Sequence, residues 1–277
     1  MMKDLYLAIL VAMFCTLGIR AEIYVNNIRY QIDTAGNAYV DGYKSGSNLG
    51  ALNIPSTIQY QGKTYNVTKI GYGAFGYCKT LESVTLPSSV QIIEDGAFRY
   101  CVMLKSVELS PSLKKIKAYA FAASGLVQVK IPDNLVQIEG NLFSDCSNLE
   151  KVELGKGMKY ISNDMFRGCK KLTTISIPKN IMAIGDRAFQ DCDLHEIKLP
   201  SAMIGVEGEI FRGNHNLKKV TCYVKTPFRL PGNNFEQNTY FNGELFVPRG
   251  SLELYKSADG WKNFKSIRET NESETGE

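Results

Sequence analysis

Cysteine is the residue type in this chain best suited to metal binding or redox chemistry, and seven cysteines occur. Five of them lie three residues after a phenylalanine, at Cys78, Cys101, Cys146, Cys169 and Cys192. Zinc sites usually use close C-x₂-C pairs, and the sequence has no such pair. Disulfides between neighbouring units remain an alternative, although Ser124 and Asn214 interrupt the series. We favour the interpretation that these cysteines are small buried side chains beside the phenylalanines.

Hydrolytic chemistry would need a nucleophile, a base and a group that orients the base. Only two histidines occur, His195 and His215, and His195 has the acidic neighbours Asp193 and Glu196. No serine or cysteine is placed by the sequence to act with them. We therefore predict a chain that is not an enzyme and binds no metal or cofactor. The alternative function is an envelope hydrolase or enzyme accessory that uses loops near residues 226–244.

An internal repeat must position all of these residues. Its phenylalanine column is spaced by 22 or 23 residues and reads Phe75, Phe98, Phe121, Phe143, Phe166, Phe189 and Phe211. Parallel columns of Leu, Val or Ile accompany it, and all length variation falls between each phenylalanine and the next leucine. A buried segment could not lose a residue without disturbing its neighbours, so this variable stretch is expected at the surface.

Each unit reads approximately L-x-x-V-x-L-P-x-x-V-x-x-I-x-x-x-A-F-x-x-C. The segment SVTLP at 83–87 alternates apolar and polar residues, which predicts a half-buried strand ended by proline. Phe98 and Cys101 are spaced to share one side of a short helical turn. A single unit cannot bury its apolar residues, whereas stacked units can. The repeat predicts a solenoid of about seven 22–23-residue rungs, mainly β with short helical turns.

This unit resembles the BspA-like bacterial leucine-rich repeats, which carry the same AF..C segment, and the resemblance covers about residues 50–225. It implies a leucine-rich repeat solenoid and, by family analogy, contact with a host or neighbouring-cell protein. The chain departs from ordinary leucine-rich repeats because a continuous asparagine ladder is missing. The curvature of that common class therefore cannot be assumed.

Both ends of a solenoid need caps, because a terminal rung would otherwise expose its apolar interior. Residues 22–69 predict a β cap with an incomplete first rung, and YVNNIRYQI at 24–32 predicts a hairpin. Residues 70–222 are the predicted solenoid and residues 223–268 the predicted C-terminal cap. The polar residues 269–277 are expected to be a flexible tail.

Residues 1–21 have the pattern of a signal peptide, with cleavage expected after Ala21. The apolar run from Leu5 to Gly18 is shorter than the roughly 20 residues that span a bilayer. We expect a secreted or cell-surface protein without a transmembrane segment in the mature chain. The formal net charge of +4 comes without a concentrated basic stripe, so nucleic acid is not an expected partner.

Two stripes of outward strand residues form the first candidate partner-binding surface, here called the strand face. One stripe reads Thr85, Glu108, Lys130, Glu153, Ser176, Lys198 and Thr221. The other reads Ser83, Ser106, Gln128, Lys151, Thr174, Glu196 and Lys219. Their charges alternate in sign and no aromatic residue joins them, so a merely solvated face is the alternative interpretation.

The second candidate surface is a group of tyrosines near the first rungs, here called the tyrosine patch: Tyr72, Tyr77, Tyr100 and Tyr119. Tyrosine is enriched at protein interfaces because an apolar ring carries a polar tip. Ordinary packing around the AF segment is the alternative. The predicted partner is a protein, and the sequence does not determine the oligomeric state, although an exposed end of the stack offers a route to self-association.

Overall fold

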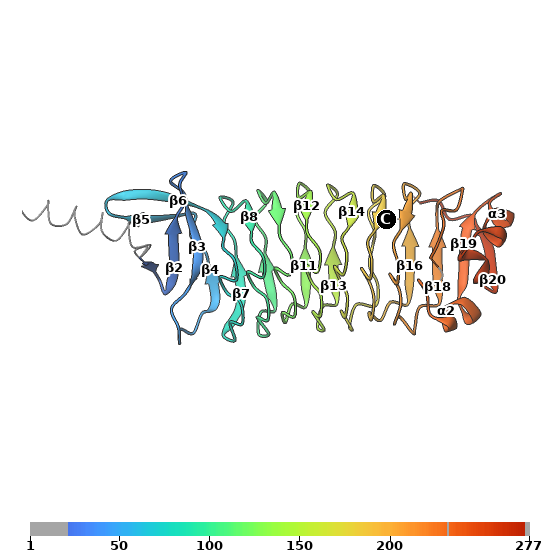
Figure 1. Ribbon diagram of the computed structural model, residues 1–277, viewed down its shortest axis with the longest axis horizontal. Helices are drawn as coiled ribbons and strands as arrows, with labels where there is room; N and C mark the ends of the chain where they lie inside the picture. Colours follow the sequence, from blue (N-terminus) through green and yellow to red (C-terminus); the bar gives the residue numbers. More distant parts are fainter. Residues whose placement is uncertain (1–21, 232, 275–277) are drawn as a thin grey trace, which may run out of the picture.

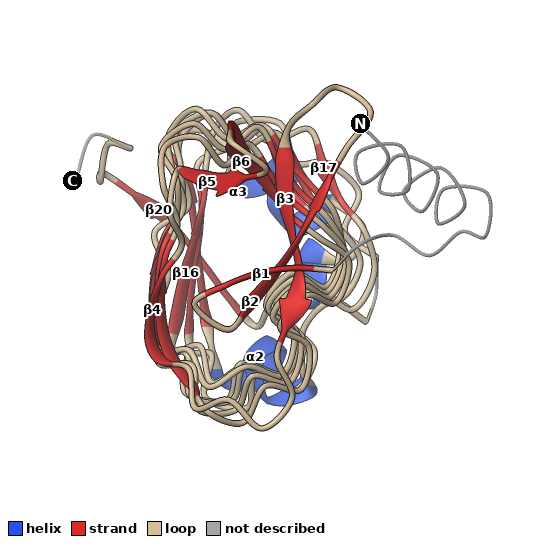
Figure 2. Ribbon diagram, turned by 90° about the vertical axis from the view of Figure 1, so that its left-hand side faces the viewer, coloured by secondary structure: helices blue, strands red, loops and turns tan. Residues whose placement is uncertain are grey.

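The computed structural model describes residues 22–231 and 233–274, and the predicted signal peptide lies outside the described residues. The chain forms one elongated β-solenoid whose rungs follow one another along the long axis (Figure 1). Viewed along this axis, strands form two walls that are joined by loops and turns (Figure 2). The predicted fold class, a capped solenoid of stacked 22–23-residue rungs, is confirmed.

The first wall consists of the strands that open most rungs, and those that pair are parallel and in register. In the rung of Leu172, residues 172–178 form no strand. Val84 pairs with Val107, and Val129 pairs with Val152, so equivalent residues of successive units lie side by side. Alternation along each strand sends these valines inward and their polar neighbours outward. The wall contains β4 (Gly50–Asn53), β7 (Leu81–Thr85), β9 (Ser106–Glu108), β11 (Gln128–Lys130), β13 (Lys151–Glu153), β16 (Glu196–Leu199), β18 (Lys219–Cys222), β19 (Glu244–Pro248) and β20 (Ser266–Thr270).

The second wall consists of shorter parallel strands from the middle of each unit. Ile93 pairs with Ile116, and both side chains are fully buried. The wall contains β6 (Lys63–Ile70), β8 (Ile92–Ile93), β10 (Lys115–Ile116), β12 (Gln137–Ile138), β14 (Tyr160–Ile161), β15 (Ala183–Ile184) and β17 (Gly205–Val206). Each of the six strands after β6 has only two residues, because the chain must bend immediately into the AF segment.

The AF segment of each rung, which surrounds its phenylalanine, is a series of turns rather than the expected helical turn. Two residues in each segment have positive φ, one two positions before the phenylalanine (position −2) and one two positions after it (position +2). In the first rung these are Gly73 and Tyr77, with φ of 56° and 61°. Asp164 and Gly168 occupy the same positions in a later rung, with φ of 54° and 74°.

Because of the positive φ at positions −2 and +2, alternate backbone N–H groups of the AF segment point toward the following rung. Gly73, Phe75 and Tyr77 donate hydrogen bonds to carbonyl oxygens of the next AF segment, at 2.8–3.0 Å. The same three bonds recur at each AF segment as far as the rung of Phe189. These segments therefore form a third hydrogen-bonded side of the solenoid, here called the AF wall.

Nine aromatic rings stack through the centre of the molecule, in a series here called the ring column. It runs through Tyr43, Phe75, Phe98, Phe121, Phe143, Phe166, Phe189, Phe211 and Phe235. Ring centroids are 5.1–6.1 Å apart and the planes differ by at most 19°. The seven repeat phenylalanines are at most 1% exposed. The prediction that like-numbered residues share one dry interior is confirmed, and each cap adds a further ring.

The N-terminal cap covers the first rung with antiparallel strands. β1 (Ile23–Val25) and β2 (Ile28–Ile32) form the hairpin expected from the sequence, with Asn26 and Asn27 at φ of 49° and 65°. Strand β3 (Ala38–Tyr43) follows β2 antiparallel and joins β6 in parallel. Between β4 and the second wall, β5 (Thr57–Tyr60) pairs with the start of β6 as a hairpin.

The C-terminal cap closes the other end with α2 (Gln237–Asn242), α3 (Leu252–Ser257), η1 (Trp261–Asn263) and strands β19 and β20. Trp261 is fully buried, and its indole N–H donates to the Phe228 carbonyl at 2.8 Å. The Glu236 carboxylate accepts a hydrogen bond from the Gly213 N–H at 2.8 Å, and the Asn234 carbonyl accepts one from the Phe211 N–H. These acceptors satisfy the N–H groups that the last AF segment directs beyond the stack.

The described residues contain no helix that is both long enough and apolar enough to cross a bilayer. The predicted boundary of the C-terminal tail needs correction, because β20 continues to Thr270, beyond the expected end of the cap at residue 268. Residues 275–277 lie outside the described part of the chain.

Candidate partner-binding surfaces

The cysteines of the repeat lie inside the stack and all six described cysteines are free thiols. The Cys101, Cys146 and Cys192 thiols donate hydrogen bonds to the carbonyl of the phenylalanine one rung earlier, at 3.0–3.1 Å. Asn214 makes the same contact to Phe189 at 2.7 Å, which explains why it can replace cysteine in the column. The structure supports the buried-thiol interpretation, and its described cysteines form no disulfide.

Burial raises the pKa of these thiols, because the interior disfavours the charged thiolate. The pKa of Cys101 and Cys192 rises to about 12 and that of Cys146 to about 11. A protonated, inaccessible thiol is a poor nucleophile and a poor metal ligand. Among the described residues, no group of three or more His, Cys, Asp or Glu side chains is arranged to hold a metal ion.

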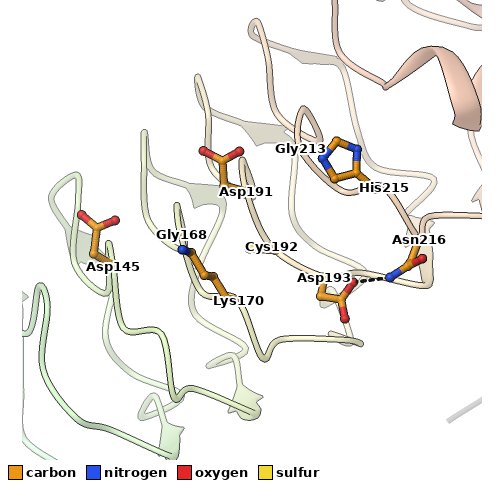
Figure 3. A pocket seen from close by; sticks show the side chains of 9 residues that line it. All are labelled: Asp145, Gly168, Lys170, Asp191, Cys192, Asp193, Gly213, His215 and Asn216. Carbon is orange, nitrogen blue, oxygen red and sulfur yellow. Dashed lines mark hydrogen bonds between the residues drawn. The ribbon is translucent and has the colours of Figure 1, made fainter.

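His215 lies in an open groove beside the AF wall, and His195 lines a neighbouring hollow that shares Asn216 with it. The groove has a volume of about 530 Å³, and its side chains come from four successive rungs (Figure 3). It is lined by Asp145, Gly168, Lys170, Asp191, Cys192, Asp193, Gly213, His215 and Asn216. Asp193 accepts a hydrogen bond from Asn216 at 2.8 Å, and His195 lies 3.7 Å from the same carboxylate.

These contacts do not assemble the hydrolytic group considered from the sequence. His195 pairs with Asp193, but the only cysteine at the groove, Cys192, is 5% exposed and bonded to a backbone carbonyl. Glu236, one of two acidic residues in the loop region 226–244, accepts a hydrogen bond from the Gly213 N–H. The described groups of the groove are thus held by contacts with one another and with the backbone.

The strand face presents its predicted residues outward, with one exception. Ser83, Thr85 and Lys219 are half-buried; the exposed residues are Ser106, Glu108, Gln128, Lys130, Lys151, Glu153, Thr174, Ser176, Glu196 and Lys198. Several of its polar groups bind one another across rungs, as Lys130 does with Glu153 at 2.9 Å and Thr85 with Glu108 at 3.4 Å. Both members of the Lys130–Glu153 pair are more than two-thirds exposed, so the pair contributes little stability.

Thr221 is the exception, because it is 1% exposed and cannot contact a partner. Its rung partners in register are Lys198 and Phe246, and Lys219 lies over the Phe246 ring at 5.5 Å. Thr221 must therefore be removed from the candidate surface. The repeat pattern could not show this, because Phe246 of the cap strand β19, which pairs with Thr221, lies outside the repeat.

The residues after β20 fold back onto this end of the strand face. Glu272 lies 3.3 Å from the Lys198 ammonium and 4.0 Å from that of Lys219. Glu274 accepts a hydrogen bond from the Ser201 N–H at 3.0 Å. The segment expected to be a flexible tail thus makes specific contacts as far as Glu274, and it occupies the lysines at this end of the face.

The tyrosine patch is only partly a single cluster. The Tyr77 and Tyr100 rings stack at 4.7 Å between centroids, on the outside of the AF wall. The Arg99 guanidinium lies over Tyr100 at 5.0 Å and over Tyr119 at 4.9 Å, so it joins rings from two rungs. Tyr72 is 82% exposed and stands apart from these ring contacts. The patch therefore centres on three tyrosines and one arginine.

Sequence reasoning missed Arg99 and the exposed apolar side chains Val102 and Met103, which follow Tyr100 and are 55% and 42% exposed. It also missed an ion-pair network further along the AF wall. Asp164 binds Arg187 through both of its oxygens, at 2.9 and 3.1 Å, and its carboxylate lies 3.3 Å from Arg167. The residue types at positions −2 and +1 of the repeat, compared across rungs, would have indicated both Arg99 and this ion-pair network.

The comparisons with known proteins agree with this architecture. A family model for the BspA type leucine-rich repeat region matches residues 68–192 and 136–239, with six copies of the repeat. No curated protein matches the chain.

Solved structures with the same fold come from several bacteria. A leucine-rich cell surface protein from Faecalibacterium prausnitzii superposes with a TM-score of 0.65 at 21% identity, over 90% of this chain and 72% of that one. Leucine-rich repeat proteins from T. pallidum and Bacteroides ovatus give TM-scores of 0.56 and 0.55 at 22% and 21% identity. They cover 87% and 90% of this chain and 99% and 76% of their own. From the matched repeats and the stacked rungs that they form, the chain belongs to the BspA-type leucine-rich repeat family.

Proposed function

We propose that this protein is an exported, non-enzymatic module that binds a partner protein or mediates adhesion through a rigid repeat surface. The predicted signal peptide supports export, and the similarity to a cell surface protein of Faecalibacterium prausnitzii is consistent with it. The partner is a host or neighbouring-cell surface protein. The family is a scaffold family, and scaffold folds obtain their function from the surface that they display.

The observation that carries this proposal is the exposed aromatic cluster on the AF wall. Tyr77 and Tyr100 are 65% and 36% exposed, yet their rings stack on one another and the Arg99 guanidinium lies over the Tyr100 ring. A fixed aromatic surface loses little conformational entropy when it binds, and tyrosine and arginine are the residues enriched at energetic centres of interfaces. The strand face offers less, because many of its charges already bind one another or the C-terminal segment.

The test is a binding measurement with the mature chain, using extracellular proteins of host and neighbouring cells as probes. Changing Tyr77 and Tyr100 together to Ala should weaken binding at least about thirtyfold, as expected for two interface hot spots. The matched control changes Lys130 and Glu153 to Ala on the strand face and should bind as the unaltered chain does. Equal binding by all three proteins would move the proposed site away from the AF wall.

Export has a separate measurement. The mass of the protein recovered from its native source should correspond to a chain that begins at Glu22, if cleavage follows Ala21. Recovery of the intact chain inside the cell would contradict this part of the proposal and leave the binding surface untouched.

A further inference from the structure

Arg99 differs from the other arginines at its repeat position. Arg167 and Arg212 also lie one residue after the phenylalanine, at position +1. Each forms an ion pair with the acidic residue three positions earlier, Asp164 at 3.3 Å and Glu209 at 2.9 Å. Within the described residues, Arg99 has no ion pair and no hydrogen bond from its guanidinium; its Nε is buried without an acceptor, as is that of Arg167.

The cause of this difference is visible in the sequence. Position −2, which carries Asp164 and Glu209 in the later rungs, is Gly96 in the rung of Arg99. The carboxylates nearby in sequence, Glu94 and Asp95, instead contact Lys117, and Glu94 also lies 3.9 Å from Lys69. The next rung supplies Tyr119 rather than an acid, so the guanidinium lies against two tyrosine rings.

An arginine fixed between aromatic rings, with unused donors and no counter-charge, is prepared to bind an anion. Within the described residues, Arg99 is the only cation that lies over these tyrosine rings. The backbone cannot add to it, because the N–H groups of Tyr77 and Tyr100 already donate to the next rung. A singly charged carboxylate fits this donor set better than phosphate, which usually engages several cations or a cluster of backbone N–H groups.

The surroundings indicate where that carboxylate comes from. The Tyr77–Tyr100 stack lies beside the guanidinium, and Val102 and Met103 are exposed a few residues further along. Aromatic residues, methionine and arginine together are typical of the centre of a protein interface. We propose that Arg99, Tyr77, Tyr100 and Tyr119 form a binding site for an aspartate or glutamate side chain of the partner protein. This inference rests on the proposed protein-binding function.

The repeat itself supplies the decisive variant. Gly96 has φ of 59°, and the equivalent Asp164 has φ of 54°, so aspartate is accepted in this conformation. A Cβ atom added at Gly96 would meet only the Arg99 side chain, at 3.7 Å and beyond. Gly96→Asp therefore introduces the missing carboxylate within the rung and should occupy Arg99. Gly96→Asn is the matched control, because Asn141 holds the same position in another rung with φ of 61°.

The measurement is an NMR titration of the Arg99 Nε–Hε signal in the mature chain, assigned by its loss in Arg99→Gln. The probe is the blocked tripeptide acetyl-Gly-Glu-Gly-amide, with acetyl-Gly-Gln-Gly-amide as its neutral counterpart. The glutamate peptide should shift the signal saturably in the unaltered chain and in Gly96→Asn. Gly96→Asp should weaken this binding about tenfold or more, as expected when a charge-assisted hydrogen bond is lost.

Three results would overturn the inference: no saturable shift with the glutamate peptide, an equal shift with the glutamine peptide, or tighter binding of inorganic phosphate. The glutamate and glutamine arms in the unaltered chain decide the matter even if Gly96→Asp does not fold. The titration reports Arg99 alone, whereas partner binding reports the whole surface. A partner that binds without moving the Arg99 signal would refute only this inference. Peptide binding without any protein partner would refute only the proposed function.

Discussion

The early and late rungs of the AF wall share one backbone and differ in surface chemistry. Position −2 is Gly96 and then Tyr119 in the early rungs, and Asp164 and then Arg187 in the late ones, yet all four have φ between 54° and 59°. The early rungs expose tyrosines around an uncompensated arginine, whereas the late rungs join their charges into pairs. The comparison teaches that inter-rung hydrogen bonds and the ring column determine the backbone, which leaves the outward residues free to vary.

Substitutions in the ring column should have the largest effect on stability, and the effect should be equal in the early and late rungs. Phe98→Ala and Phe166→Ala should each lower the free energy of unfolding by about 3–5 kcal/mol, because both rings are fully buried between two others. Urea unfolding followed by circular dichroism measures both. A loss in one region several times larger than in the other would show that the early and late rungs are not equivalent inside.

The buried thiols should make the stability of the same interior depend on pH. Their folded pKa values are raised above the usual value, so their stabilisation is complete below about pH 8.5 and is lost as pH rises. Between about pH 9 and pH 12, Cys101 and Cys192 should each reduce stability by about 1.4 kcal/mol per pH unit. Cys192→Ala should make the decline of stability above pH 9 less steep.

Thiol accessibility provides the independent check of that prediction. The native protein at neutral pH should react slowly with a thiol reagent, whereas the denatured, unreduced protein should expose all six described cysteines as free thiols. Fewer than six would restore the disulfide alternative.

Substitutions at the charged residues of the AF wall should change the free energy of unfolding by less, and by different amounts in the early and late rungs. Asp164→Asn keeps a residue that tolerates positive φ but removes the charge that Arg167 and Arg187 share, and it should cost about 1 kcal/mol of unfolding free energy. Arg99→Gln removes no hydrogen bond or ion pair and should change stability by only about 0.5 kcal/mol. Equal losses would mean that Arg99 has a structural role like that of the paired arginines in the late rungs.

The smallest expected effect is on the strand face. Glu153→Ala removes a carboxylate that is 70% exposed and paired with a lysine that is 77% exposed. The free energy of unfolding should therefore change by no more than about 0.5 kcal/mol. Thermal unfolding alongside Phe166→Ala compares an outward and an inward residue directly. A large loss for Glu153→Ala would reverse the assignment of the two sides of this strand.

Much of the fold was predictable because apolar periodicity reports burial directly. The position of each phenylalanine and the pairing of Val84 with Val107 follow from the 23-residue spacing. The alternating turn conformation of the AF segment did not follow, because Gly73, Tyr119 and Asp164 share one φ region without sharing a residue type.

The candidate site was predictable only in part, because surface contacts depend on side-chain direction and on segments far apart in sequence. The tyrosines were found, but the guanidinium between Tyr100 and Tyr119 depends on how two rungs are aligned. The burial of Thr221 and the contact of Glu272 with Lys198 depend on the cap, where the repeat no longer guides prediction.

The direction of the hydrogen bonds in the AF wall gives the solenoid an electrical polarity. From Phe75 to Phe189 the inter-rung N–H groups point the same way, toward the C-terminal cap, so their peptide dipoles add along the axis. The C-terminal face of the stack should accordingly attract negative charge, and Glu236 provides it there. Lengthening the stack by whole rungs would move this electropositive face outward unchanged, provided that an acidic cap moved with it.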